Sequence, residues 1–398
     1  MNPDLEKLQP YPFERLMALK QGLTPPAQLS HIAMSIGEPK HAAPAFAKQA
    51  LADSLDSLNH YPLTKGGDEL RTAIASWLIK RFQLSNASVD PERHVIPVSG
   101  TREALFAFAQ ALVDRSKIAK VLMPNPFYQI YEGATLLAGA QPVFLNTTKE
   151  TNYLIDIDAI NEQTWHDCQL IYICSPGNPT GAVMSLQQMQ HLIELAEKFD
   201  FVIASDECYS EIYPHEQTPP AGLLEAAHAM GNTDFKHCLV FNSLSKRSNL
   251  PGLRSGFVAG DADIIAKFLK YRTYHGCAIP PPAQVASTAA WSDETHVLQN
   301  RELYRAKFAA VLDILMPVLD VQAPDASFYL WPRLPVDDTV FAKRLFAEQH
   351  LSVIPGQFLS RQADGINPGQ NHIRMALVAS IDECIEAAER MKQVLSTL

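Results

Sequence analysis

The sequence predicts an α/β fold, with a large domain that holds a mostly parallel sheet flanked by helices and a smaller α+β domain built from both chain ends. Short runs of apolar and β-branched residues recur through the middle of the chain, each bounded by Pro, Gly, Ser or Asp. Amphipathic helical patterns lie between these runs. Continuous apolar runs are typical of strands that are buried on both faces, and their alternation with helices indicates a sheet covered on both sides.

The strands expected in this sheet share apolar character on both faces; they are His94–Val98, Lys120–Met123, Gln169–Cys174, Phe201–Ser205, Cys238–Phe241 and Gly256–Ala259. Two of the intervening segments, Glu103–Leu112 and Leu186–Lys198, carry apolar residues at helical spacing. The middle of the chain therefore predicts repeated strand–helix units.

After about residue 290 the alternation of apolar strand runs with helical patterns ends. Long amphipathic helices are expected at Val297–Leu319 and Ile381–Leu395, with short strands at Phe328–Trp331 and His372–Ala376. The segment before about residue 45 is rich in Pro and turns. We expect a large domain over residues 46–290 and a small domain assembled from 1–45 and 291–398.

Composition excludes several classes of protein. The 398 residues are 47% hydrophobic and 19% charged, which is ordinary for a globular protein of about two domains. A net charge of −10 argues against binding along nucleic acid, which needs a basic face. No signal peptide and no apolar run of about 18 residues is present, and the six cysteines lack metal-type spacing. The sequence predicts a cytoplasmic protein without nucleic-acid, membrane or metal partners.

Polar residues follow the predicted strands, where ligands bind in sheets of this kind. Lys246 comes shortly after Cys238–Phe241, with Ser243 before it and Arg254 eight positions later. An arbitrary lysine is more often a solvated surface residue. Among fixed positive charges, however, a lysine amine has a lowered pKa and can act as a Schiff-base nucleophile, while an arginine fork suits phosphate oxygens.

Three further strand ends carry candidate groups. Asp206 is either a helix N-cap or the partner of a protonated ring nitrogen, and Tyr209 follows three residues later. Asn178 lies in a Pro- and Gly-rich turn and could donate to an oxygen on a ring. Gly100 and Thr101 open a helix, whose free N–H groups can bind an anion. Each signal alone is weak, but together they describe one site for a phosphorylated ring.

These residues resemble those of the fold-type I, class I aminotransferases, the relatives of aspartate aminotransferase. The resemblance covers most of the chain and is carried by Ser243-Leu-Ser-Lys246, Asn178-Pro-Thr-Gly181, Asn125-Pro-Phe-Tyr128 and His372-Ile-Arg374. It implies a pyridoxal 5'-phosphate enzyme whose small-molecule substrates are an amino acid and a 2-oxo acid, in which Lys246 carries the cofactor and then moves a proton.

The resemblance also implies a role for each of the other residues. At the cofactor ring it places Asp206 on the nitrogen, Asn178 and Tyr209 on the hydroxyl, and Tyr128 against the face. At the phosphate it places Ser243, Arg254 and the helix start at Gly100, Thr101 and Arg102. Arg374 and the backbone N–H of Gly37 are expected to bind the substrate α-carboxylate. Tyr61 is expected to reach the phosphate from a partner subunit, which implies a homodimer with shared active sites.

Within this family the chain is most similar to the N-succinyldiaminopimelate aminotransferases of lysine and diaminopimelate biosynthesis. The similarity is carried by Leu8–Phe13, Asn125–Tyr131, Ser205–Tyr213, Ser245–Asn249 and Tyr271–Gly276. It implies transfer from N-succinyl-LL-diaminopimelate to 2-oxoglutarate, with Arg102 as the candidate for the distal carboxylate. A surface arginine paired with a nearby acid is the alternative reading of Arg102.

Other functions stay open at this point. The chain could act on aspartate, alanine or aromatic amino acids, although no arginine near Ile279–Pro282 supports strict aspartate specificity. A C–S lyase of the same fold and a cofactor-binding regulator without turnover are further alternatives. The complete set of Lys246, Asp206 and Arg374 argues against the regulator.

Overall fold

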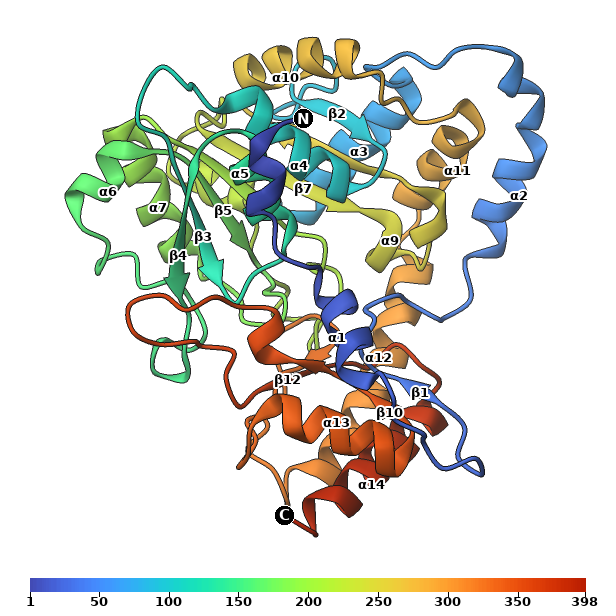
Figure 1. Ribbon diagram of the computed structural model, residues 1–398. Helices are drawn as coiled ribbons and strands as arrows, with labels where there is room; N and C mark the ends of the chain where they lie inside the picture. Colours follow the sequence, from blue (N-terminus) through green and yellow to red (C-terminus); the bar gives the residue numbers. More distant parts are fainter.

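A seven-stranded sheet forms the centre of the computed structural model, which describes residues 1–398 (Figure 1). The strand order is β2-β8-β7-β6-β5-β3-β4. Its strands are β2 (Val95–Val98), β3 (Lys120–Asn125), β4 (Gln141–Asn146), β5 (Cys168–Cys174), β6 (Val202–Asp206), β7 (Cys238–Ser243) and β8 (Gly256–Gly260). Only β8 runs against its neighbours, β2 and β7. The prediction of a mostly parallel α/β sheet is therefore confirmed.

All six predicted strands are present, and the strand that the sequence did not reveal is β4. This strand lies at the edge of the sheet and pairs with β3 alone. None of its residues is fully buried. An edge strand needs no continuous apolar run, so β4 gives no periodic signal.

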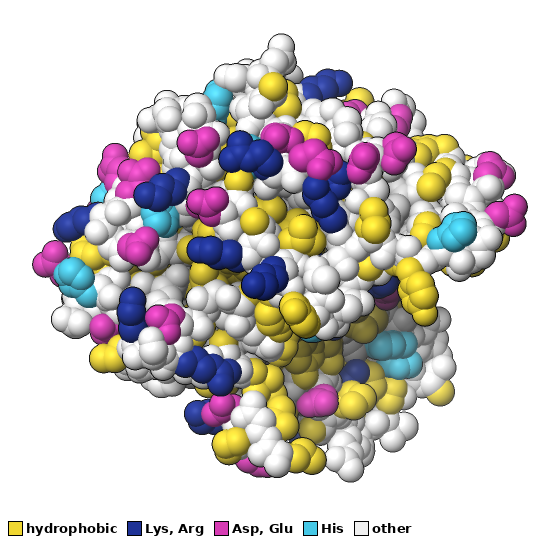
Figure 2. All heavy atoms as spheres, turned by 90° about the horizontal axis from the view of Figure 1, so that it is seen from above, with side chains coloured by type: hydrophobic (Ala, Val, Ile, Leu, Met, Phe, Trp, Pro, Cys, Tyr) yellow, Lys and Arg dark blue, Asp and Glu magenta, His cyan; other side chains and the backbone are white.

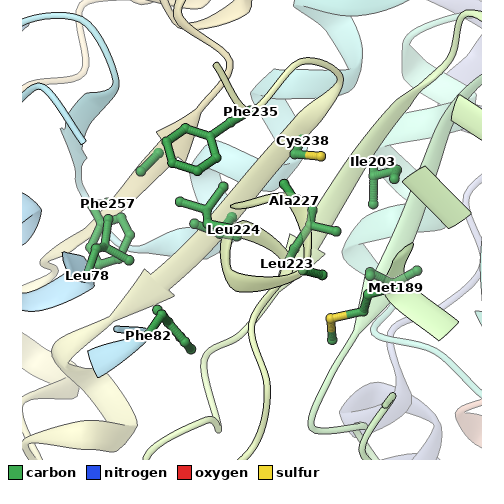
Figure 3. Packing of buried hydrophobic residues seen from close by; sticks show 14 of the residues in the cluster. Leu78, Phe82, Met189, Ile203, Leu223, Leu224, Ala227, Phe235, Cys238 and Phe257 are labelled. Carbon is green, nitrogen blue, oxygen red and sulfur yellow. The ribbon is translucent and has the colours of Figure 1, made fainter. Parts of the chain in front are cut away.

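The sheet is buried on both faces. Neighbouring residues of β5 alternate between two apolar clusters, with Ile171 and Ile173 in one and Leu170 and Tyr172 in the other. Figure 3 shows part of the first cluster, in which Leu223 and Leu224 belong to one packed group with Ile203 and Phe235. The helices of this part are α2 (Ala45–Asp53), α3 (Asp68–Arg81), α4 (Thr101–Leu112), α5 (Ile130–Leu137), α6 (Glu162–Asp167), α7 (Leu186–Phe199), α8 (Leu223–Ala229), α9 (Leu244–Arg247), α10 (Ala262–His275) and α11 (Pro281–Trp291).

A second body, at the bottom of Figure 1, joins the two chain ends. Strand β1 (Ile32–Ala33) pairs in parallel with β10 (Leu351–Ser352). Strands β11 (Ile354–Pro355), β12 (Ile373–Ala376) and β9 (Tyr329–Leu330) form an antiparallel sheet in that order. The helices are α1 (Pro12–Lys20), α12 (Thr295–Leu315), α13 (Asp338–Gln349) and α14 (Ile381–Leu395). This body has an apolar cluster of its own, as an α+β unit built from both ends requires.

Two expectations for the chain ends need correction. Helix α12 ends at Leu315 rather than Leu319, because Pro317 cannot continue a helix. Helix α1 lies in the segment that was expected to hold only turns; it begins at Pro12, a position where proline suits a helix start. Short 3-10 turns are η1 (Pro3–Lys7), η2 (Leu55–Asn59), η3 (Lys149–Thr151), η4 (Pro251–Leu253) and η5 (Gly356–Phe358).

Charged side chains of both signs are interspersed on the face shown in Figure 2. That face presents no continuous basic stripe of the kind that follows a nucleic-acid backbone. None of the helices combines the length and the apolar character that a membrane span needs.

Candidate active site

A cavity of about 600 Å³ lies where the carboxyl ends of the parallel strands meet the second body. Eleven of the residues expected from the sequence line it: Gly37, Thr101, Arg102, Tyr128, Asn178, Asp206, Tyr209, Ser243, Lys246, Arg254 and Arg374. They come from strand ends, from the start of α4, from the N-terminal segment and from β12. The fold therefore assembles one site from residues that are far apart in the sequence.

Lys246 lies in α9, the single helical turn that follows β7. Its Nζ donates a hydrogen bond to the carbonyl oxygen of Gly37, and it forms no ion pair. Burial lowers the pKa of the amine to about 8, and the positive charge of Arg374 adds to this effect. A larger fraction of the amine is therefore neutral, and so nucleophilic, than for a solvated lysine.

Asp206 ends β6 and is 4% exposed. Its Oδ2 accepts a hydrogen bond of 2.8 Å from the Tyr131 hydroxyl, and its Oδ1 accepts one of 3.3 Å from the Cys208 N–H. Burial raises the pKa of this carboxyl, although both hydrogen bonds favour the charged form. No helix starts after Asp206, so the alternative of a helix N-cap is wrong. A buried carboxylate that forms no ion pair within its own chain suits a positively charged ligand group.

An anion cradle lies at the start of α4. Gly100 has a φ of 85°, and a Cβ at this position would lie 2.3 Å from Nη2 of Arg254. The absence of a side chain thus lets the Arg254 guanidinium approach the helix start. Ser243 and Ser245 add hydroxyl groups to the same cavity wall. Free helix N–H groups, a guanidinium and hydroxyls form a donor set that fits a phosphate group.

Arg374 lies in β12 of the second body and is 5% exposed. Its guanidinium donates to Oδ1 of Asn178 and to the carbonyl oxygen of Ser35, each at 2.9 Å. The buried Nε of Arg374 has no partner within the chain. A guanidinium held by neutral acceptors keeps its full charge toward a ligand, so it can clamp a carboxylate.

Glycine is required at position 37, because a Cβ there would lie 2.1 Å from the Tyr329 hydroxyl oxygen. The hydroxyl groups of Tyr329 and Tyr209 are 3.0 Å apart and share a hydrogen bond. Burial raises the pKa of Tyr209 well above its usual value, so the phenol is neutral and can donate. Tyr209 and Asn178 both line the cavity with polar groups suited to a ring hydroxyl.

Arg102 and Tyr128 lie together on the cavity wall. Nε of Arg102 donates to the Tyr128 hydroxyl at 2.7 Å, and its guanidinium lies 5.9 Å from the ring centre of Tyr11. Arg102 is exposed, and its side chain contacts tyrosines rather than a carboxylate of the chain. Its Nη groups are available to a ligand.

The sequence reasoning missed Tyr131 and Tyr329, which hold Asp206 and Tyr209. Tyr131 was part of a distinctive segment, and Tyr329 of a predicted strand, but neither carried a chemical signal of its own. Tyr61 does not line the cavity of its own chain, and its side chain is 100% exposed. Its contribution to a partner subunit's site stays a prediction.

Comparisons with known proteins agree with this geometry. The family model described as aminotransferase class I and II matches residues 30–391. The LL-diaminopimelate aminotransferase of Aquifex aeolicus is 31% identical, with 98% of each chain covered. The crystal structure of an aminotransferase from Neisseria meningitidis is 46% identical, with a TM-score of 0.94 and 99% of each chain covered. A probable N-succinyldiaminopimelate aminotransferase from Thermus thermophilus is 25% identical, with a TM-score of 0.84, over 96% of this chain and 100% of that one.

Enzymes of this class depend on pyridoxal 5'-phosphate, and the residues present fit each part of that cofactor. The cavity offers an amine of low pKa for an aldehyde, a buried carboxylate for a ring nitrogen and a cradle for a phosphate. On the match of its sequence, its fold and this set of residues, the chain belongs to the class I and II aminotransferases.

Proposed function

We propose that this aminotransferase transfers the amino group of N-succinyl-LL-diaminopimelate to 2-oxoglutarate, a step of lysine and diaminopimelate biosynthesis. The observation that carries the proposal is the pair of arginines, Arg102 and Arg374, whose guanidinium groups face one cavity without a carboxylate partner. Arg374 suits the α-carboxylate of the substrate and Arg102 a second carboxylate at its distal end. Both reaction partners in the proposal carry two or more carboxylates.

The roles of the cavity residues follow from their geometry. Pyridoxal 5'-phosphate, when bound, supplies an aldehyde carbon and an electron-withdrawing ring. Nζ of Lys246 would bind that carbon until the substrate amine displaces it, and the freed amine would then carry a proton away from the substrate Cα. Asp206 would hold the proton on the ring nitrogen. The phosphate would be held by Arg254, Ser243 and the helix start at Gly100–Thr101. Asn178 and Tyr209 would donate to the ring hydroxyl. Tyr128 would lie against the ring face.

At the substrate end, Arg374 and the N–H of Gly37 would orient the α-carboxylate. This orientation matters because proton transfer requires the Cα–H bond to face Lys246. The cavity thus separates two tasks. Residues at the strand ends would hold the cofactor. Residues of the second body and the N-terminal segment would hold the substrate α-carboxylate, and Arg102 of α4 would hold its distal carboxylate.

We also propose a homodimer. Tyr61 and its neighbours Leu58 and Leu63 are 100%, 60% and 70% exposed, which is unusual for large apolar side chains so close together. A second copy of the chain would cover them and would bring Tyr61 to the phosphate of the other site. Sedimentation at micromolar concentration should give twice the mass of one chain, and a monomer would contradict this part of the proposal.

The experiment that tests the substrate assignment is a panel of amino donors with 2-oxoglutarate. N-succinyl-LL-diaminopimelate should give the highest kcat/KM, above LL-diaminopimelate, aspartate, alanine and phenylalanine. A second candidate is transfer from unacylated LL-diaminopimelate, which the name of the Aquifex aeolicus relative favours. A higher kcat/KM for that substrate would replace the first assignment. Ammonia release with a keto acid, in place of stoichiometric transfer, would indicate a lyase.

A further inference from the structure

A chain of hydrogen bonds connects the backbone of Lys246 to a buried lysine in α12. Nζ of Lys307 lies 2.6 Å from Nε2 of His41, and Nδ1 of His41 lies 2.7 Å from Oδ1 of Asn300. Nδ2 of Asn300 donates to the carbonyl oxygens of Lys246 and Arg247, at 3.3 and 3.5 Å. Asn300 and Lys307 are each 3% exposed, so water does not compete for these contacts.

When Lys307 is protonated, the direction of every hydrogen bond in this chain is fixed. The Lys307 ammonium has three N–H groups and three acceptors, namely His41 Nε2 and the carbonyl oxygens of Leu377 and Val378. Because an ammonium only donates, Nε2 of His41 accepts, so Nδ1 carries the hydrogen and donates to Asn300. Burial lowers the pKa of His41, which favours this neutral ring. The amide of Asn249 also donates to Oδ1 of Asn300, at 3.0 Å, and so fixes the orientation of that amide.

His41 belongs to the N-terminal strap, which we define as residues 35–41. The strap includes three residues that line the cavity, Ile36, Gly37 and Glu38. It contacts the Lys246 turn at two points: directly, where Nζ of Lys246 donates to the Gly37 carbonyl, and indirectly, through His41 and Asn300. The direct contact uses the reactive amine of Lys246, so it is broken whenever that amine is engaged elsewhere. The indirect contact uses only the backbone of Lys246 and persists.

We propose that His41 is a positioning residue that keeps the N-terminal strap, and with it Gly37, docked on the Lys246 turn while the lysine amine is occupied. The inference rests on the proposed roles of Lys246 and Gly37. His41 touches neither cofactor nor substrate and acts through Asn300. The aromatic ring of His41 also packs against Tyr304, with 4.6 Å between the ring centres. Ring packing and the hydrogen bonds of the two ring nitrogens are therefore separate contributions to the docking of the strap.

The test compares three substitutions of His41. Phenylalanine keeps a ring against Tyr304 but loses both hydrogen bonds. Asparagine places an amide nitrogen where Nδ1 lies and keeps the donor to Asn300. Glutamine reaches Lys307 but does not donate to Asn300, whose Oδ1 keeps only the hydrogen bond from Asn249. His31→Phe is the matched control, because it removes a 2.8 Å hydrogen bond to Ser352 from the same N-terminal segment outside the cavity.

The first measurement is trypsin cleavage after the exposed Lys40, followed by mass spectrometry of cofactor-loaded protein without substrate. Cleavage of a native chain reports how often the local segment opens. Relative to peptides of the same sequence, cleavage should be about tenfold faster in His41→Phe and His41→Gln, and within about twofold of wild type in His41→Asn and His31→Phe. Equal rates in the asparagine and glutamine variants would overturn the proposal, even if the phenylalanine variant fails to fold.

The second measurement separates KM from kcat. His41→Phe should raise KM for the amino-acid substrate about tenfold and change kcat less than about twofold, because a loosened strap weakens carboxylate binding and leaves the proton carrier in place. An unchanged KM overturns the positioning role. Failure of the proposed function is distinguishable, since another amino donor would then give the highest kcat/KM in the wild-type enzyme while the order of the cleavage rates stayed the same.

Discussion

Two groups of cationic side chains in this molecule differ in whether they form ion pairs with carboxylates. Lys246, Arg102, Arg254 and Arg374 line the cavity, and none of them pairs with a carboxylate. In a second group every arginine is paired: Arg81, and Arg301 and Arg305 of α12, form ion pairs with the carboxylates of Glu211, Glu216 and Glu302. Arg374 is buried and Lys246 partly buried, whereas Arg102 and Arg254 are exposed at the mouth of the cavity. A buried charge without a counter-ion destabilises a fold, so we explain the first group by ligands that carry negative charge and the second by structure.

The contrast holds between adjacent residues. Lys246 faces the cavity, whereas Arg247 is 0% exposed and pairs with Glu294. Arg102 has no acid partner, whereas the next residue, Glu103, pairs with Arg272 at 2.9 Å. Opposite roles one position apart show that the pairing state of a side chain, and not its residue type, marks the site.

The largest effect is expected at Lys246. Lys246→Ala should lower kcat by at least about 10³-fold, because a positioned acid–base group contributes about 10²–10⁴-fold and the variant also loses covalent attachment. Absorbance spectra of the purified protein with pyridoxal 5'-phosphate should show no shifted band of a lysine-bound cofactor. A variant that keeps both the band and the turnover would contradict the assignment.

Arg374→Gln and Arg301→Gln test one member of each group of cations. Arg374→Gln should lower kcat/KM by ~10²-fold, equivalent to about 3 kcal/mol for a lost carboxylate clamp, with little change in stability. Arg301→Gln should leave kcat/KM unchanged and lower the free energy of unfolding by about 3 kcal/mol, because it removes one partner of a buried ion pair. Steady-state kinetics measure kcat/KM of both variants, and urea unfolding measures their free energies of unfolding. Equal stability losses would show that the two groups of cations do not differ.

Arg102→Ala tests whether a second cation of the cavity binds the distal carboxylate of the substrate. It should lower kcat/KM about tenfold for N-succinyl-LL-diaminopimelate, the cost of one charge-assisted contact, and leave the value for alanine nearly unchanged. Kinetics with both substrates on one enzyme preparation provide the internal control. A loss of the same size for alanine would remove Arg102 from distal carboxylate recognition.

The smallest expected effect is one of pH. Because the pKa of Lys246 is lowered to about 8, the neutral amine becomes more abundant as pH rises through that value. Covalent capture of pyridoxal 5'-phosphate by cofactor-free protein should therefore accelerate with a midpoint near pH 8, as measured by stopped-flow absorbance. Arg374→Gln should move the midpoint upward, since the positive charge of Arg374 contributes to the lowering, and Arg301→Gln should leave it in place. A wild-type midpoint near that of a solvated lysine, about 10.4, would contradict the account.

The strands could be predicted where burial on both faces leaves an apolar run, as in β5 and β6. Burial of this kind is absent at the edge strand β4, which the sequence did not reveal. Helix α14 was predicted with its observed ends because its apolar stripe is continuous and Ser380 caps it. In α1, by contrast, a strong proline signal masked a helix that begins at the proline itself.

The site could be predicted where chemistry follows a strand end, as at Asp206 and Lys246. Residues that act on those groups were not predictable in the same way. Tyr131 reaches Asp206 across 75 positions of sequence, and Tyr209 meets Tyr329 across 120. Such contacts depend on how helices and the second body pack, and no local pattern encodes them. The division between paired and unpaired cations is likewise a property of the folded chain.

Two buried lysines allow the most direct test of the central claim. Burial lowers the pKa of Lys246 and of Lys307 to about 8 in each case, yet all three N–H groups of Lys307 have acceptors and Lys307 does not line the cavity. Reduction of the cofactor-loaded protein with borohydride, followed by peptide mass spectrometry, identifies the lysine that holds pyridoxal 5'-phosphate. The account predicts modification of Lys246 alone, and modification of Lys307 or of several surface lysines would contradict it.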